Sequence, residues 1–197
     1  MNEQADTTIL NAVRHWLEHA VIGLNLCPFA KAVHVKKQIR TVISHATTAS
    51  ALEQDLAAEL QRLASTDPDL LDTTLLVHPY VLTDFLDYNA FLGVADRTLK
   101  RLHLSGILQI ASFHPQYQFA DSAIDAIENY TNRAPYPMLH LLREDSVSRA
   151  TQAFPDAAQI FDRNIETMRQ LDPAHLADYG FAASCPLPPK TPSKSHE

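Results

Sequence analysis

The chain has 197 residues, of which 46% are hydrophobic and 20% are charged, and its formal net charge is −7. These values predict an ordinary globular protein and argue against nucleic-acid binding by phosphate neutralisation, which needs clustered Lys and Arg. Its two cysteines, the lack of an apolar run near about 18 residues and the lack of a signal-peptide pattern argue against a secreted or membrane protein. We therefore expect a cytoplasmic protein without a nucleic-acid or membrane partner, and its oligomeric state stays open.

Apolar residues at helical spacing predict a first helix over residues 7–22, and Pro28 after Cys27 predicts the start of a short second helix. Strand-like and helical patterns then alternate along the chain. The elements in this alternation are a strand at 40–45, a helix at 50–64, a strand at 73–78, a helix at 82–102 and a strand at 107–113.

A long segment with little regular structure follows at residues 114–137, and such a segment in a compact domain is usually functional or mobile. The next run, 137–144, fits either a strand or a helix, and a strand is slightly favoured. A helix over 157–171 ends the regular pattern. Residues 182–197, rich in Pro, Ser and Lys, are predicted to be a disordered tail.

The β-α-β-α-β order predicts an α/β fold, with helices packed on a small, mainly parallel sheet of three or four strands. A ferredoxin-like α+β arrangement with some antiparallel pairing is the main alternative. We expect residues 1–181 to form a single domain.

Three histidines stand where the predicted strands end: His45, His78 and His114. In a parallel sheet these ends share one edge, which is where open α/β folds bind their ligands. Three imidazoles at that edge, His45, His78 and His114, can hold a divalent metal such as zinc, or one of them can act as a general base. The alternative is structural, with each histidine capping a carbonyl near the end of its strand.

Cys27 is the second candidate, because a thiol at a helix N-terminus meets the helix dipole and unpaired backbone N–H groups. Both favour the thiolate, so we expect a lowered pKa and a nucleophile, a metal ligand or a redox thiol. The alternative, a small buried hydrophobic residue, is common for cysteine. The candidate catalytic residues are Cys27, His78, His114 and Tyr117.

The segment 114–137 and the run after it supply polar side chains for substrate binding. Arg133 lies between two turn signals and can hold a carboxylate or phosphate with two hydrogen bonds. Asn132 and Arg143 are further candidates for the same role. For both arginines the alternative is a surface ion pair.

Several motifs occur in order: GLNLCPFAKAV, SHATT, LLVHP, ASFHPQYQFA and TNRAPYPMLHLLRE. Together they resemble an uncharacterised bacterial family, the domain of unknown function 1415. The resemblance extends over about residues 7–171. It implies no activity, substrate or cofactor, because the family has none assigned.

Two kinds of function fit these residues. The first is an enzyme for a small anionic substrate, in which Cys27 is a thiolate nucleophile with His78 or His114 as its base. In a second version of this enzyme, Cys27, His78 and His114 hold a metal that carries a water. The other function is a non-catalytic module that binds a small ligand or a partner through residues 114–137. The enzyme requires the cysteine and the histidines to converge, and the module does not.

Overall fold

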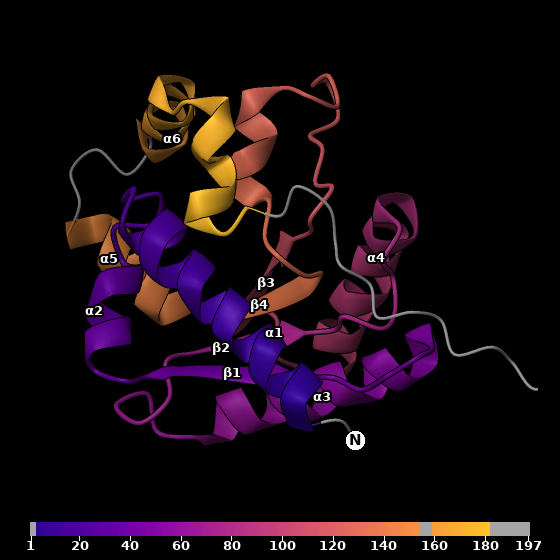
Figure 1. Ribbon diagram of the computed structural model, residues 1–197. Coiled ribbons are helices and arrows are strands. Elements are labelled where there is room, and N and C mark those ends of the chain that lie inside the picture. The colour runs from indigo at the N-terminus through magenta and orange to yellow at the C-terminus, as the bar shows by residue number, and fades with distance from the viewer. Residues whose placement is uncertain (1–2, 154–158, 182–197) are drawn as a thin grey trace, which may run out of the picture.

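A computed structural model describes residues 3–153 and 159–181 and shows one sheet with helices on both faces (Figure 1). The tail predicted for 182–197 lies outside these ranges. In chain order the elements are α1 (Glu3–Trp16), η1 (Leu17–Ile22), α2 (Ala30–Val35), β1 (Ile39–Ile43), α3 (Ala49–Ser65), β2 (Thr73–Val77), α4 (Phe85–Arg101), β3 (Leu108–Phe113), η2 (Ile127–Asn132), β4 (Met138–Arg143), α5 (Glu144–Ala153), α6 (Ile160–Gln170) and η4 (Pro173–Tyr179).

The sheet has the strand order β1-β2-β4-β3. β1 and β2 are parallel neighbours, whereas β4 lies antiparallel between β2 and β3, so β1, β2 and β3 all point the same way. Val77 at the end of β2 and Phe113 at the end of β3 both pair with Met138 at the start of β4. The predicted α/β class is confirmed, as is the strand favoured for 137–144. The inserted β4 makes the sheet mixed, because it adds the antiparallel pairing that the ferredoxin-like alternative anticipated.

Helices α3 and α4 cover one face of the sheet, and α1 crosses the other face (Figure 1). Successive side chains of a strand point to opposite faces, so Leu76 packs with α3 and α4, while Leu75 and Val77 pack with α1. Each fully buried Leu or Val side chain contributes about 1.5–3 kcal/mol. The described residues therefore form two hydrophobic clusters, one on each face of the sheet.

The first predicted helix is split. Regular α-helix ends at Trp16, and Leu17–Ile22 forms a π-helix that the apolar spacing did not indicate. The turn after it is tight, because a Cβ added at Gly23 would stand 2.3 Å from the carbonyl oxygen of His19. Glycine is thus required where the chain leaves the π-helix.

Candidate functional site

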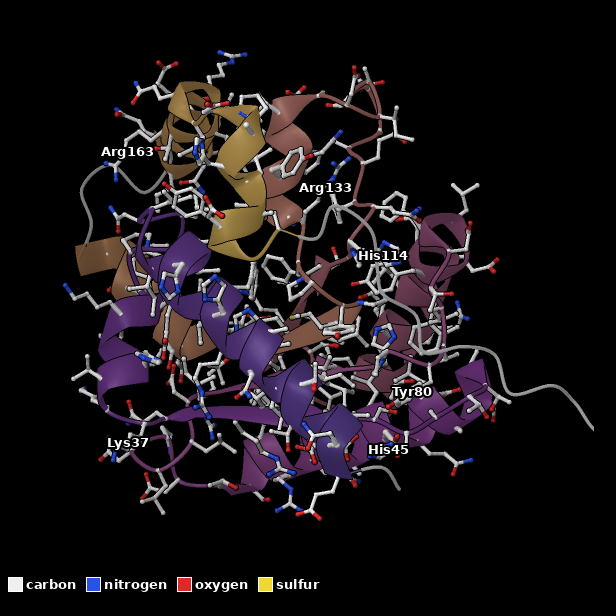
Figure 2. The ribbon with its side chains drawn as sticks, in the orientation of Figure 1. Lys37, His45, Tyr80, His114, Arg133 and Arg163 are labelled. Atoms are coloured by element: carbon white, nitrogen blue, oxygen red, sulfur yellow. The ribbon has the colours of Figure 1, made fainter. Side chains whose placement is uncertain are left out.

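The three strand-end histidines share one edge of the sheet, because β1, β2 and β3 point the same way. Figure 2 shows His45 and His114 on the side of the molecule where α4 begins. In the described part of the chain, however, no three His, Cys, Asp or Glu side chains are grouped so that they could hold a metal ion. The structure therefore does not assemble the metal trio of His45, His78 and His114. Two of these imidazoles lie in the core, and the third pairs with α1.

His78 and His114 are fully buried and hold the loop between β2 and α4. Nδ1 of His78 lies 3.0 Å from the carbonyl oxygen of Val81, and Nε2 of His114 lies 3.3 Å from that of Leu82. Because a carbonyl only accepts, His78 carries its proton on Nδ1 and His114 carries its proton on Nε2. The backbone N–H of Gln116 donates to Nδ1 of His114 at 3.0 Å, in agreement with that tautomer.

Tyr88 of α4 packs against both imidazoles, with ring centroids 5.7 Å from His78 and 5.0 Å from His114. Its hydroxyl donates to the carbonyl of Met138 and accepts the N–H of Phe113, which ties β3 to β4. Burial is the main cause that lowers the pKa of each histidine to about 4. Both imidazoles are therefore neutral at pH 7, and the one N–H group of each ring donates to a carbonyl of the loop.

His45 is the strand-end histidine that reaches solvent, with 39% of its side chain exposed. Its Nε2 lies 3.2 Å from Oδ2 of Asp6 in α1, and its ring stacks on Tyr80 with centroids 5.8 Å apart. Figure 2 shows His45 and Tyr80 close together. A carboxylate at one ring nitrogen orients an imidazole so that the other nitrogen can take up a proton. The second oxygen of Asp6, Oδ1, is buried without a hydrogen-bond partner among the described residues.

A cavity of about 460 Å³ lies beside β1, and His45 forms part of its wall. Its volume is in the range of sites for small molecules. Ser44 and Asp55 also line it, and the hydroxyl of Ser44 donates to Oδ2 of Asp55 at 2.6 Å. Apolar side chains such as Val42 and Leu76 complete the wall. The residues of the wall thus include a histidine, a serine, two acidic residues and several apolar side chains.

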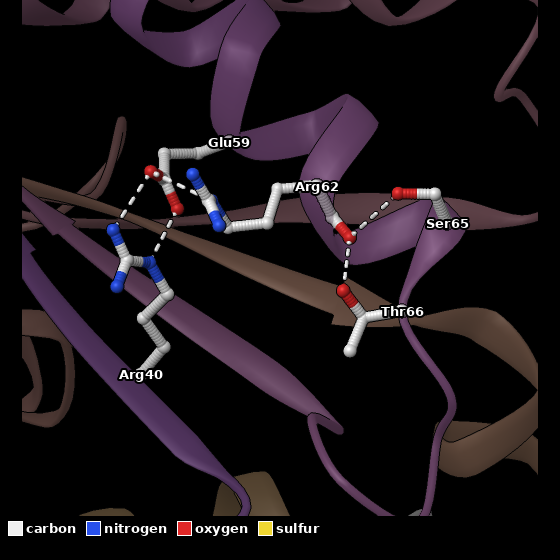
Figure 3. Close-up of polar contacts among 5 residues, drawn as sticks. All are labelled: Arg40, Glu59, Arg62, Ser65 and Thr66. Atoms are coloured by element: carbon white, nitrogen blue, oxygen red, sulfur yellow. Dashed lines mark hydrogen bonds and ion pairs between the residues drawn. The ribbon is translucent and has the colours of Figure 1, made fainter.

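Glu59 lines the same cavity, and two arginines neutralise its carboxylate (Figure 3). Arg40 donates two hydrogen bonds to it, at 2.8 and 3.1 Å, and Arg62 lies 3.6 Å away. Among the described residues Asp55 has a hydroxyl rather than a cation as its partner. The carboxylates of Asp55 and Glu59 and the guanidinium groups of Arg40 and Arg62 therefore balance in charge, and both arginines are engaged by Glu59.

Two larger hollows lie away from the strand ends. One, of about 580 Å³, is lined by α6 and the residue before it, and the other, of about 710 Å³, is lined by the end of α3 with Leu102 and Leu104. Of the residues that the structure places, no histidine or cysteine belongs to either lining. Open α/β folds bind ligands at the carboxyl ends of strands, so the cavity beside β1 is the better candidate site.

Cys27 lies in the turn between η1 and α2, where Asn164 of α6 donates to the carbonyl of Leu26 at 2.8 Å. Figure 1 shows α2 and α6 on the side opposite α4. The backbone N–H groups of Phe29 and Ala30 bind the thiol, as the sequence indicated, but burial outweighs them and raises the pKa of Cys27. The lowered pKa that we predicted is thus wrong, because desolvation of a thiolate is the larger effect here.

We expect the Cys27 thiol of the native protein to react with iodoacetamide more slowly than the same cysteine in urea. The raised pKa leaves less thiolate, and the side chain is partly covered. Timed alkylation at pH 8 followed by peptide mass spectrometry measures this rate separately from that of Cys185. A native rate above the rate in urea would show an activated thiol and contradict the expectation.

Arg133 binds its own segment of the chain. Its guanidinium donates to the carbonyl oxygens of Tyr117 at 3.3 Å and Ile124 at 2.6 Å, and it covers the ring of Tyr130 at 4.4 Å. These contacts hold the long segment between β3 and β4 in place. The arginine predicted to bind a substrate anion therefore has a structural task in this arrangement.

Asn132 and Tyr117 belong to the same segment. The side-chain amide of Asn132 donates to the carbonyl of Ser112 at 3.1 Å, which joins the segment to β3. The ring of Tyr117 packs against Phe85 at the start of α4, with centroids 5.3 Å apart. Tyr117 thus lies near His114, whose ring also contacts Phe85, but neither residue lines the cavity beside β1.

Arg143 is buried at the end of β4, with 8% of its surface exposed. Because β4 is antiparallel to its neighbours, this end lies at the sheet edge opposite the histidines. Its guanidinium donates to the backbone carbonyls of Leu63, Thr66 and Leu71. The predicted substrate-binding role is not supported, because the donors are used by the protein backbone.

Asp6, Tyr80 and Asp55 belong to the candidate site and were missed from the sequence. Asp6 lies in the first turn of α1 and meets His45 through the packing of α1 across the sheet. Tyr80 directly follows the first His-Pro pair, which was interpreted only as the end of a strand. The spacing of residues along the sequence does not reveal pairs that meet through tertiary packing. The one available signal was that the predicted parallel strands end at the same edge of the sheet.

One comparison with known proteins covers most of the chain. The model of the family described as "Protein of unknown function (DUF1415)" matches residues 8–178. No curated protein and no solved structure was found that matches the chain. Within the described ranges, none of the helices has the length and apolar character needed to cross a membrane.

Proposed function

Since the chain belongs to the family of unknown function DUF1415, which names no activity, we propose a function from the geometry of the sheet edge. The protein is an enzyme that binds a small molecule in the cavity beside β1 and removes a proton from it with His45. The observation that carries this proposal is the pairing of His45 with Asp6 at the wall of that cavity.

The proton passes from the bound molecule to Nδ1 of His45. Nε2 stays beside Oδ2 of Asp6, at 3.2 Å, and the carboxylate stabilises the imidazolium that forms. Stacking on Tyr80 limits rotation of the ring, so the accepting nitrogen keeps its direction. The unpaired Oδ1 of Asp6 supports the proposal, because an unsatisfied buried acceptor is a cost that native proteins rarely retain without a role.

The lining favours a small molecule with hydrogen-bond donors. Asp55 and the hydroxyl of Ser44 offer acceptors, while Arg40 and Arg62 are engaged by Glu59. From the sequence we expected an anionic substrate. At this cavity the arginines that could bind an anion are already paired with Glu59. The ligand class proposed here is therefore a small amine or alcohol.

The proposal uses neither Cys27 nor a metal. Cys27 lies near α6 rather than at the histidine edge, and the described residues group no set of three ligands. A location in the bacterial cytoplasm is part of the same proposal. It is supported by the thiol of Cys27, which is free among the residues that the structure describes, since thiols persist in reducing compartments.

Nuclear magnetic resonance with a panel of small amines, alcohols and carboxylates tests the proposal. We expect amines or alcohols at millimolar concentration to shift the amide signals of Ser44, His45 and Asp55, and carboxylates to leave them unchanged. In His45→Gln and Asp55→Asn variants the affinity should fall about tenfold or more, a loss of about 1.4 kcal/mol or more.

The matched control is His175→Gln, which removes an exposed histidine that also pairs with an aspartate, Asp172, at 3.3 Å but lies outside the cavity. This variant should bind every probe as the wild type does. Binding that shifts signals elsewhere, or that survives His45→Gln unchanged, would remove His45 from the site and with it the proposed general base.

A further inference from the structure

We propose that His78 and His114 form a latch, with opposite tautomers, that positions Tyr80 against His45. The β2–α4 loop, residues 78–84, is the part that the latch holds. The inference rests on the proposed function only in giving the latch a purpose, since the latch itself can be measured without any ligand.

The latch binds two consecutive carbonyls of the loop. His78 donates from Nδ1 to Val81, and His114 donates from Nε2 to Leu82. The two histidines directly follow different strands, β2 and β3, with β4 between these strands. They fix the loop to the rigid sheet on both sides of β4.

The loop needs such an anchor because its backbone is strained. Leu82 has a φ of +55°, in the left-handed region that residues with a Cβ avoid. A conformation of this kind persists only when its surroundings enforce it. The hydrogen bond from His114 to the carbonyl of Leu82 acts at the strained residue itself.

A purely packing role does not account for an imidazole at position 78. Nε2 of His78 is buried and has no hydrogen-bond partner among the described residues, which is unfavourable for the fold. An apolar side chain at the same place would remove this unpaired nitrogen, but it would also leave the carbonyl of Val81 without its donor. What the imidazole adds is the Nδ1–H bond to Val81, so that bond is the reason for a histidine here.

The loop connects the latch to the cavity. Tyr80 lies inside the loop, one residue before Val81, and its ring stacks on His45. His45 lines the cavity, whereas Tyr80, His78 and His114 do not. His78 and His114 are therefore positioning residues: they act on the general base through Tyr80 and touch no ligand.

Amide substitutions test the latch, because the side-chain nitrogen of Asn replaces Nδ1 of histidine and that of Gln replaces Nε2. The readout is the chemical shift of the His45 ring protons at pH 7, which the ring current of Tyr80 displaces. A Tyr80→Leu variant gives the value without this displacement. We expect His78→Asn and His114→Gln to keep the wild-type shift, and His78→Gln and His114→Asn to move toward the Tyr80→Leu value.

The crossed order separates a latch from packing. If side-chain size alone matters, Asn and Gln will rank the same way at both positions, and the latch is overturned. It is also overturned if all four variants keep the wild-type shift or all four lose it. If no probe binds the cavity but the crossed order holds, the proposed function fails and the latch stands.

Discussion

Acidification from pH 7 to pH 4 should lower the free energy of unfolding by several kcal/mol. Burial lowers the pKa of His78, His114 and His140 to about 4, against an ordinary value of 6.5. A depressed pKa means that the folded state prefers the neutral imidazole. The stabilisation is complete above pH 6.5 and is lost as the pH falls toward 4, by up to about 3 kcal/mol for each histidine.

Urea unfolding at pH 7, 6, 5 and 4.5 measures this loss. In His78→Asn one titrating group is removed, so the slope of stability against pH between 6.5 and 4 should decrease by about one proton. His175→Gln, which removes an exposed histidine outside the core, is measured beside it as the control variant. A free energy of unfolding that is the same at pH 7 and pH 5 would show that the three imidazoles are not buried in the neutral form.

Replacing Arg143 with Met should cost about 3–5 kcal/mol of stability. The guanidinium donates to the carbonyl of Leu63 in the last turn of α3 and to those of Thr66 and Leu71 between α3 and β2. Methionine fills much of the space but donates no hydrogen bond, and each buried carbonyl left unpaired costs about 1–3 kcal/mol. The predicted effect is therefore one of the largest that a single substitution can have in this protein.

Chemical denaturation of Arg143→Met and of a control, Arg149→Met, measures the difference. Arg149 is exposed and donates to the hydroxyl of Ser146, so its loss should change stability by less than about 0.5 kcal/mol. A cost below 1 kcal/mol for Arg143→Met would mean that water reaches the three carbonyls and that the arginine is free for another role.

The architecture could be predicted well because its signals are local. The β-branched runs gave β1, β2 and β3 within a few residues of their ends, and the His-Pro pairs marked where β2 and β3 stop. The position of β4 could not be predicted, since nothing in MLHLLR says that this strand enters between β2 and β3. The π-helix after Trp16 was hidden for a related reason, because its apolar residues continue the helical pattern.

The site could be predicted only in part. The direction of β1, β2 and β3 placed His45, His78 and His114 at one edge, but whether each side chain faces the core or solvent depends on register and on the loop that follows. His78 and His114 are covered by Phe85 and Tyr88 of α4, whereas His45 meets Asp6 from the opposite layer. Contacts of this kind depend on tertiary packing, and no motif in this sequence indicates them.

The protonation and tautomer states of the histidines can be measured from the nuclear magnetic resonance signals of the imidazole nitrogens in the unmodified protein at pH 7. We expect a neutral His78 with its proton on Nδ1 and a neutral His114 with its proton on Nε2. Both signals should persist unchanged down to pH 5. If the two residues show the same tautomer, or if either is protonated at pH 7, the buried latch does not exist and all three histidines must be reconsidered as members of one open site.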